Sequence, residues 1–592
     1  MHHPAPPTDT HHSMPCLRRL AGCAALLLAA SASAAGSGAA GDGIKVNQVG
    51  FAPAAQKLAV VPAPAQERFA VVDASTGKAV YEGQLQDAAA WDASGERVRV
   101  ADFSTLRMPG RYRIRVAGLP DSAPFAVQAG VYRELGIAAI RNYTLNRSGI
   151  ALTPAVAGPY ARPFAHPDTK VAVHPSAASA KRPAGTVISS PKGWYDAGDY
   201  NKYIVNSGVT TYTLLAAYEH YPAWFEKLAL NLPESGNGLP DILNEALWNL
   251  EWMITMQDPD DGGVYHKLTN KTFDGMVMPE KATAPRYVVQ KTTAATLDFA
   301  AVMAVAGRVL APFDSQQPGR SARYLAAAQA AYRWAEAHPQ VLYEQPADIQ
   351  TGAYGDKSVE DEFAWAAAEL LIATGKDTYR ARALAGPAQQ AGQTAPGWAD
   401  VGLLGSISLA RPGARLPQGV DAGPARERLL AAADTLAARW RASPYRISMD
   451  RNDFVWGSNS VILNQAMMLA AAYRIDPRPD YRNAAQSALD YVLGRNPLGM
   501  SYVTGFGAHS PQHPHHRPSE ADGVQAPVPG MLAGGPNPGQ QDAKDCQGAR
   551  YASKLPALSY IDHMCSYASN EIAINWNAPL VYVTAALESQ QP

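Results

Sequence analysis

Two different hydrophobic periods divide the chain into a smaller N-terminal part and a larger C-terminal part. Between residues 44 and 128, apolar and polar residues alternate in short runs such as Arg68-Phe-Ala-Val-Val72, and turn sequences such as Ser75-Thr-Gly77 lie between the runs. Alternation with a period of two is typical of strands that bury one face. Several short strands at this spacing predict a small β-sandwich.

From residue 131 to about 590 the period is that of helices. Apolar residues recur at three and four positions, as they do at Leu239, Ile242, Leu243, Ala246 and Leu250, which places them on one helix face. No convincing strand pattern lies in this part. Helices joined by variable loops predict an all-α barrel of hairpins with a cleft at one end. Helices are predicted over residues 205–220, 239–254, 292–311, 321–338, 360–374, 424–441, 459–475 and 481–494.

Composition and charge limit the class of protein. At 592 residues the chain exceeds what one hydrophobic core usually holds, so two domains are expected. The formal net charge is -1, so the chain lacks the excess of positive charge that is typical of proteins that bind nucleic acid or an anionic membrane. With 47% hydrophobic and 17% charged residues, we expect a soluble globular protein, and a monomer is the simplest assembly.

The N-terminus has the pattern of an export signal. Arg18 and Arg19 precede an apolar run from Leu20 to Ala30, and small residues follow at 31–35. A short apolar segment between a basic stretch and small residues is typical of a cleaved signal peptide. We therefore expect residues 1–35 to be removed and the protein to be periplasmic or secreted.

Two cysteines remain after the predicted cleavage. Cys16 and Cys23 leave with the signal, whereas Cys546 and Cys565 stay in the mature chain. An even pair in an exported protein most simply forms one disulfide bond. A loop of about 20 residues closed in this way contributes roughly 3 kcal/mol to stability in the chain-entropy account.

The segment from Gly193 to Tyr203 combines two carboxylates with aromatic residues. Asp196 and Asp199 lie three positions apart, and two carboxylates on one turn compete for protons, which makes one of them an effective base. Aromatic faces with polar tips suit the binding of a sugar ring; the candidates are Trp194, Tyr195 and Tyr203. Alternatively, either aspartate caps the helix that begins near residue 205.

Three other segments contain unusual chemistry. Glu571 lies among apolar residues, and burial among them would raise its pKa. Alternatively, Glu571 is an ordinary glutamate in the first turn of a helix. The acidic run 358–362 begins a helix, where it either complements the helix dipole or forms one side of a calcium site. The histidine-rich segment 509–517 contains prolines that preclude a helix, so donation to hydroxyls fits better than zinc.

An exported protein with an aspartate pair, a distant glutamate and many aromatic residues has the components of a glycosidase, which needs one carboxylic acid and one carboxylate. The sequence resembles glycoside hydrolase family 9, the inverting cellulase family, in its subgroup with an N-terminal immunoglobulin-like domain. Three motifs carry the resemblance: Trp194-Tyr-Asp-Ala-Gly-Asp199, the segment from Ser501-Tyr-Val-Thr-Gly505 to Pro514-His-His-Arg517, and the segment from Tyr560 through Asn570-Glu571 to Trp576-Asn-Ala-Pro579.

The resemblance implies an immunoglobulin-like domain over residues 44–128 and an (α/α)6 barrel over residues 131–590. It implies Asp199 as general base, Asp196 as a second holder of the attacking water and Glu571 as general acid. His515, Arg517 and Asp562 would line and orient the site. A structural calcium ion is expected at Asp361, Glu362 and Asp400. We expect substrate contacts from Arg517, Trp194, Tyr195, Tyr203, Tyr567 and Trp456.

The expected substrate is a β-1,4-linked glucan, soluble or amorphous. Within enzymes, the alternative is an exo-acting β-glucosidase or β-glucosaminidase that acts on short oligosaccharides. Outside enzymes, the alternative is a carbohydrate-binding protein with an inactive barrel, which would be expected to lack Asp199 or Glu571. A zinc hydrolase built on the histidine segment is a third alternative. For the N-terminal domain, structural bracing is favoured over sugar binding, because several of its aromatic residues occupy core positions of the strand pattern.

Overall fold

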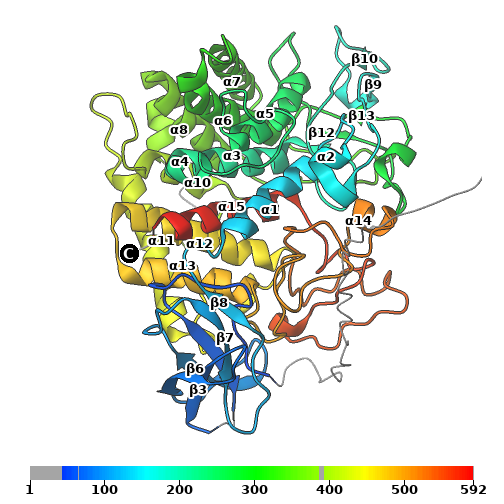
Figure 1. Cartoon of the computed structure of the whole chain (residues 1–592). Helices are drawn as coiled ribbons and strands as arrows, with labels where there is room; N and C mark the ends of the chain where they lie inside the picture. Colours follow the sequence, from blue (N-terminus) through cyan, green and yellow to red (C-terminus); the bar gives the residue numbers. More distant parts are fainter. Residues whose placement is uncertain (1–42, 64–65, 386–391, 591–592) are drawn as a thin grey trace, which may run out of the picture. The chain divides into compact units, whose positions relative to one another are not determined.

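The structure is a computed structural model that describes residues 43–63, 66–385 and 392–590 (Figure 1). The predicted export signal lies in residues 1–42, outside the described residues. The chain from Ala40 onwards forms one compact unit, so the two predicted domains are not separate bodies.

The N-terminal part is built from two antiparallel-rich sheets, drawn in blue in Figure 1. One has the order β1-β8-β7-β3-β4 and the other the order β2-β6-β5. In β3, Phe69, Val71 and Val72 are buried while Arg68 is exposed, as the alternating pattern predicts. The strands are β1 (Gly50–Phe51), β2 (Leu58–Pro62), β3 (Arg68–Asp73), β4 (Ala79–Gln84), β5 (Ala89–Trp91), β6 (Glu96–Asp102), β7 (Gly110–Arg115) and β8 (Phe125–Val127).

The C-terminal part is mainly helical, and each predicted helix is present within a few residues of its predicted bounds. Helices α6, α7 and α8 pack side by side, and α15 packs against α1, α3 and α12. The longer helices are α1 (Arg133–Leu145), α3 (Ile204–His220), α5 (Asp241–Met253), α6 (Thr293–Leu310), α7 (Arg320–Ala337), α8 (Glu360–Thr374), α10 (Gly402–Ala410), α11 (Gly423–Ala442), α12 (Ser458–Ile475), α13 (Pro479–Val492) and α15 (Ile574–Ser589). The shorter ones are α2 (Pro154–Ala157), α4 (Pro222–Phe225), α9 (Arg380–Ala385) and α14 (Arg517–Ala521).

Local sequence explains several helix ends. Thr292 caps α6 by accepting a hydrogen bond from the amide of Ala295. Helix α8 has three acidic residues in its first turn, which suits the positive end of the helix dipole, and Gly375 ends it at a φ of 69°. The predicted set missed α1, α10 and α15.

The expectation that the helical part contains no strands is wrong. A second five-stranded sheet has the order β10-β9-β13-β12-β11. Each strand has only two or three residues, which is too short to give a detectable alternation. The strands are β9 (Val171–Val173), β10 (Val187–Ile188), β11 (Lys202–Tyr203), β12 (Lys267–Thr269) and β13 (Tyr287–Val288).

The sandwich has its own hydrophobic core, and a few of its residues also pack into the core of the helical part. Trp91 of β5 is 7% exposed and its ring lies 4.4 Å from that of Tyr445 and 6.1 Å from that of Phe454. Asn47 donates a hydrogen bond to Asp490 of α13 at 2.9 Å. These contacts support the bracing role that was favoured for the N-terminal domain.

Among the described residues, one segment has the length and apolar character of a membrane span, namely Thr293–Phe313. Buried residues make up 89% of its most apolar window, so the segment, most of which is helix α6, packs inside the protein.

Candidate active site

Buried aromatic residues support the turn that carries Asp196 and Asp199. Trp194 is 0% exposed and donates its indole N–H to Glu245 at 2.8 Å. Tyr195 is 1% exposed and donates its hydroxyl to Nδ1 of His166 at 2.7 Å, because Nε2 of that imidazole donates to a backbone carbonyl. Side chains this buried do not present a face to a sugar. The substrate contacts expected from Trp194 and Tyr195 are therefore replaced by a supporting role.

The two aspartates are buried in different surroundings. Asp196 is 2% exposed and accepts hydrogen bonds from Asn206 at 2.6 Å and Tyr354 at 2.7 Å. Burial, and next the charge of Asp199, raise the pKa of Asp196 far above its ordinary value.

Asp199 is 6% exposed, and the hydrogen bonds that it receives all reach one oxygen. Oδ2 accepts from the amide of Asn201 at 2.5 Å and from the hydroxyl of Tyr203 at 3.2 Å. Among the described residues, no hydrogen-bond donor reaches Oδ1. Tyr203 is thus a partner of Asp199 and is itself only 1% exposed, so it holds the carboxylate and does not stack on a sugar.

Glu571 is brought to the same turn from the far end of the chain. Its Oε1 lies 3.4 Å from the backbone N–H of Gly198, and its backbone forms a bridge with His515. Burial, followed by the charges of Asp199 and Asp196, raises the pKa of Glu571 well above its ordinary value. The structure therefore gathers all three predicted catalytic carboxyls, and it favours a proton on Glu571.

His515 lies beside this carboxyl cluster. Its Nδ1 is 2.5 Å from the carbonyl oxygen of Met564, and since a carbonyl only accepts, Nδ1 carries the proton. Burial lowers the pKa of His515 to about 4, so Nε2 is an acceptor at neutral pH. His516 bonds instead to Ser519 and Asn146. The two histidines therefore have separate partners, which disfavours the zinc alternative.

Arg517 and Asp562 act on the surrounding loops. Arg517 donates to the backbone oxygens of Gly198 at 2.5 Å and Asp274 at 2.9 Å. Asp562 accepts from the backbone amides of Gln512 at 2.7 Å and His513 at 3.0 Å. Arg517 thus ties the histidine loop to the turn that carries Asp199, whereas Asp562 ties the histidine loop to Asn570, the residue before Glu571.

Trp456 and Tyr567 form an aromatic pair that faces solvent. Their rings lie 5.5 Å apart, and Trp456 is 42% exposed. The ring of Tyr567 also lies 6.1 Å from that of His515, which places the pair next to the carboxyl cluster. An exposed aromatic pair in this position suits stacking against a sugar ring.

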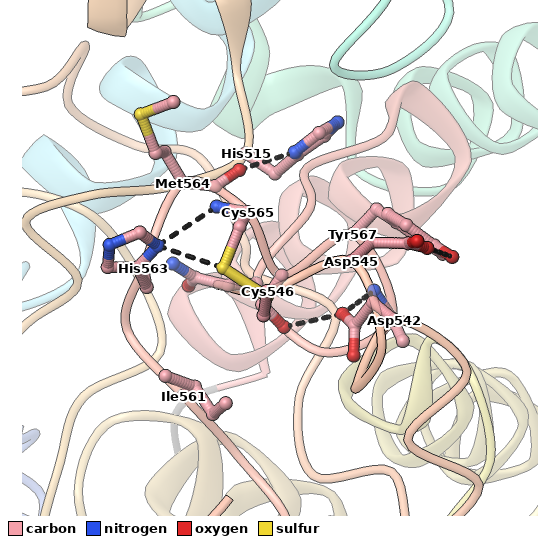
Figure 2. The surroundings of a disulfide bond; sticks show 12 residues. His515, Asp542, Asp545, Cys546, Ile561, His563, Met564, Cys565 and Tyr567 are labelled. Carbon is pink, nitrogen blue, oxygen red and sulfur yellow. Dashed lines mark hydrogen bonds between the residues drawn. A yellow bond between two sulfur atoms is a disulfide. The ribbon is translucent and has the colours of Figure 1, made fainter. Parts of the chain in front are cut away.

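The predicted disulfide bond is confirmed and lies next to the histidine loop (Figure 2). It joins Cys546 to Cys565 with a Cα–Cα distance of 5.1 Å. Met564, whose carbonyl accepts from His515, directly precedes Cys565, as Figure 2 shows. The disulfide therefore limits the movement of the carbonyl that orients His515.

The residues predicted to bind calcium lie in an acidic cluster. Glu362 is 0% exposed, and among the residues that the structure describes neither of its carboxylate oxygens has a hydrogen-bond partner. The same holds for Asp298 of α6, which the sequence pattern did not single out. Asp361 accepts from the amide of Val401 at 2.8 Å, whereas Asp400 is exposed.

This cluster fits calcium in its chemistry but is not a closed metal site. Calcium prefers oxygen ligands, and buried carboxylates without partners are costly unless a cation or a proton neutralises them. Within the described ranges, however, no three acidic, histidine or cysteine side chains are gathered closely enough to hold a metal ion.

Sequence reasoning missed several residues that contact the aspartate pair. Tyr354 lies in a loop, adopts a positive φ of 47° and is 158 positions from its partner Asp196. Asn201 and Asn206 are ordinary amides in the sequence and gain importance only from their partners. Asn201 lies inside the Gly193–Tyr203 segment, but nothing in the sequence distinguishes its amide. No motif or periodicity marks Tyr354 and Asn206, so only spatial proximity finds the roles of all three.

Comparisons with known proteins agree with this geometry. Residues 132–584 match the family model described as glycosyl hydrolase family 9, and residues 39–121 match the cellulase N-terminal ig-like domain. A xyloglucan-specific endo-beta-1,4-glucanase of Bacteroides ovatus is 44% identical over 561 residues, which are 93% of this chain and 94% of the relative. Endoglucanase D of Acetivibrio thermocellus is 33% identical over 552 residues, which cover 92% of this chain and 83% of the relative.

A solved structure of a family 9 protein from Bacteroides ovatus has a TM-score of 0.86 and 42% identity to this chain. It covers 93% of this chain and 100% of its own. The expected architecture, an immunoglobulin-like domain followed by an (α/α)6 barrel, is thereby confirmed.

Proposed function

Since this chain belongs to glycosyl hydrolase family 9 and is a glycoside hydrolase of the endo-β-1,4-glucanase type, we propose that it inverts the anomeric configuration, with Asp199 as general base and Glu571 as general acid. The observation that carries the proposal is the contrast between the two carboxyls. Oδ2 of Asp199 accepts two hydrogen bonds that hold its carboxyl group in place, whereas burial and two neighbouring carboxylates favour a proton on Glu571.

In the proposed reaction, Glu571, Asp199 and Asp196 each have one role. Glu571 gives its proton to the glycosidic oxygen as the bond from the anomeric carbon to that oxygen breaks. Asp199 takes a proton from a water molecule, whose oxygen forms the new bond on the opposite face of the sugar. Asp196, which accepts from Asn206 and Tyr354, helps to fix the position of that water.

The proposed substrate is a β-1,4-glucan, and xyloglucan is the first one to test. One relative is named as a xyloglucan-specific endo-beta-1,4-glucanase and another as an endoglucanase. The exposed pair of Trp456 and Tyr567 offers a stacking surface beside the carboxyls. Product profiles on xyloglucan, carboxymethylcellulose, cellohexaose and chitosan oligomers separate this proposal from exo action. Release of single glucose or glucosamine units from chain ends would favour the exo alternative.

The variants D199A and E571A test the catalytic assignment on a soluble glucan. Each is expected to lose at least about 10²-fold in kcat, the usual contribution of general acid or base catalysis. Proton NMR of the wild-type reaction is expected to detect the α-anomer first. A β-anomer as the first product would falsify the inverting mechanism, and a fully active D199A would remove Asp199 from its role.

We also propose that a calcium ion stabilises the fold at Asp361, Glu362 and Asp400, with these side chains drawn closer together around the bound ion than they lie in this structure. The support is the buried, unpartnered carboxylate of Glu362 and the oxygen-only chemistry of the cluster. When bound, the ion would supply positive charge to these carboxylates and would take no part in the proposed hydrolysis.

Export of the protein remains a proposal as well. The disulfide between Cys546 and Cys565 supports it, because such bonds persist in oxidising compartments. N-terminal sequencing of the mature protein is expected to begin near residue 36, and an intact N-terminus would contradict cleavage.

A further inference from the structure

A buried lysine lies behind the proposed general base. Lys267 begins β12 and stands opposite Tyr203 of β11, the tyrosine that donates to Asp199. Its side chain is buried, and its ammonium group donates to the carbonyl of Gly352 at 2.6 Å and to the hydroxyl of Thr351 at 3.1 Å. Within the described part of the chain, Lys267 has no direct salt bridge to a carboxylate.

A chain of hydrogen bonds connects this ammonium group to Asp199. The hydroxyls of Thr351 and Thr269 lie 2.6 Å apart, and the hydroxyl of Thr269 lies 3.1 Å from Oδ1 of Asn201. Nδ2 of Asn201 donates to Oδ2 of Asp199 at 2.5 Å. Two threonines and one amide therefore bridge the lysine and the carboxylate.

The positive charge fixes the direction of the first bonds in this chain. An ammonium group only donates, so Thr351 accepts from Lys267 and directs its own proton to Thr269. The single proton of the Thr269 hydroxyl is shared between Oδ1 of Asn201 at 3.1 Å and the carbonyl of Asn270 at 2.8 Å, and the backbone N–H of Asn270 also donates to Oδ1 of Asn201 at 2.9 Å. The amide of Asn201 must consequently present its N–H donors to Asp199.

The charges around Asp199 make a cation at this position important. Three carboxyl groups lie near Asp199: Asp196 on the same turn, Glu571 in the segment before α15 and Asp274 in the loop after β12. A negative charge on any of them disfavours a second negative charge nearby. Arg517 of α14 is directed to the carbonyls of Gly198 and Asp274. Lys267 contacts Asp199 through the relay and through Tyr203, whose ring lies 5.6 Å from its ammonium group.

We propose that Lys267 is a positioning residue that, through Thr351, Thr269 and Asn201, orients and keeps ionised the carboxylate of Asp199. The inference rests on the proposed function, because it assumes that Asp199 acts as the base. Burial lowers the pKa of Lys267 to about 7, while the charge of Asp199 raises it. The lysine is therefore protonated below neutral pH, in the range where the base needs help to lose its proton.

The test is the pH profile of kcat/KM for K267M, which removes the charge and nearly preserves the length of the side chain. Its acid limb is expected to move up by about one pH unit, so that activity well below neutral pH falls about tenfold. KM is expected to change little, because Lys267 is buried and does not reach the substrate. K267R keeps the charge and is expected to keep the acid limb nearer to that of the wild type.

Matched variants separate the relay from general damage. K271M removes an exposed lysine four positions further along, which pairs with Asp348, and is expected to leave the profile unchanged. T351V leaves the bond from Lys267 to Gly352 but breaks the relay, and it is expected to move the acid limb in the same direction by less. T351V also tests the proposal if K267M does not fold.

An unmoved acid limb in folded K267M, or in folded T351V, would overturn the inference. An equal shift in K271M would overturn it as well. Failure of the proposed function is distinguishable, because it would be seen as activity that persists in D199A. An inactive D199A together with an unmoved limb in K267M rejects the relay alone.

Discussion

The backbone N–H of Gly198 lies 3.4 Å from Oε1 of Glu571, although 373 positions separate the two residues. Gly198 directly precedes the proposed base, so this contact sets how closely the acid approaches the catalytic turn. A glycine is required there, because a Cβ would lie 2.4 Å from the carbonyl oxygen of His515 and 3.2 Å from Oε1 of Glu571.

The variant G198A is therefore expected to displace His515 or Glu571 and to lose about 10²-fold in kcat, as misplacements near 1 Å do. The melting temperature should fall much less than the activity. The control is G275A in a neighbouring loop, where a Cβ meets nothing within 4 Å. Wild-type kcat in purified G198A would contradict the tight fit.

The raised pKa of Glu571 predicts a pH-dependent gain in stability for E571Q. The folded-state pKa lies above the ordinary value of 4.5, so the native state loses stability as the pH rises from 4.5 toward the folded pKa. Glutamine does not ionise, and E571Q is expected to gain at most about 1.4 kcal/mol per pH unit in this range.

Thermal unfolding of E571Q and wild type from pH 4 to 8 measures this effect. The two melting temperatures should converge at low pH and separate as the pH rises. E82Q, at an exposed position on β4, is the control and should follow the wild type. A constant difference across the whole range would show that burial does not perturb Glu571.

Loss of the disulfide is expected to lower turnover before it unfolds the barrel. In C546S/C565S, the segment that carries the Met564 carbonyl is freed, and His515 loses a fixed partner (Figure 2). The free energy of unfolding should drop by roughly 3 kcal/mol. Circular dichroism and kcat at 25 °C separate the two effects, and unchanged turnover in the folded variant would count against the bracing role.

The variant W456A tests the exposed aromatic pair as a sugar-binding surface. Removal of the indole is expected to raise KM about tenfold on polymeric glucan, which equals about 1.4 kcal/mol, with a small effect on kcat. The neighbouring V455A is the matched control, because Val455 is 45% exposed. Equal KM values for W456A and the wild type would remove Trp456 from the substrate site.

Calcium removal is expected to lower the melting temperature, since an ion that binds only the native state stabilises it by mass action. Added calcium should restore the lost stability. E362Q should abolish the calcium dependence, whereas D377N, at the exposed residue Asp377, should retain it. A melting temperature that a strong chelator leaves untouched would rule out the site.

Long periodic segments were predictable because their information is local. The eight predicted helices and the alternating strands could be predicted because the residues that face a core repeat at short, regular spacings along the sequence. The proposed catalytic carboxyls were equally predictable, because Asp196, Asp199 and Glu571 stand in motifs that resemble those of a known family. The disulfide followed from having one cysteine pair in the mature chain.

The sequence by itself thus determined the two kinds of architecture and the chemical groups of the site. Only the tertiary structure decided that Trp194, Tyr195 and Tyr203 lie buried beneath the turn, and that Tyr354 and Lys267 stand behind the aspartates. The reason is physical: burial and hydrogen bonding depend on which distant segments meet. Strands of two or three residues leave no pattern, yet β11 and β12 bring the lysine relay to the proposed base.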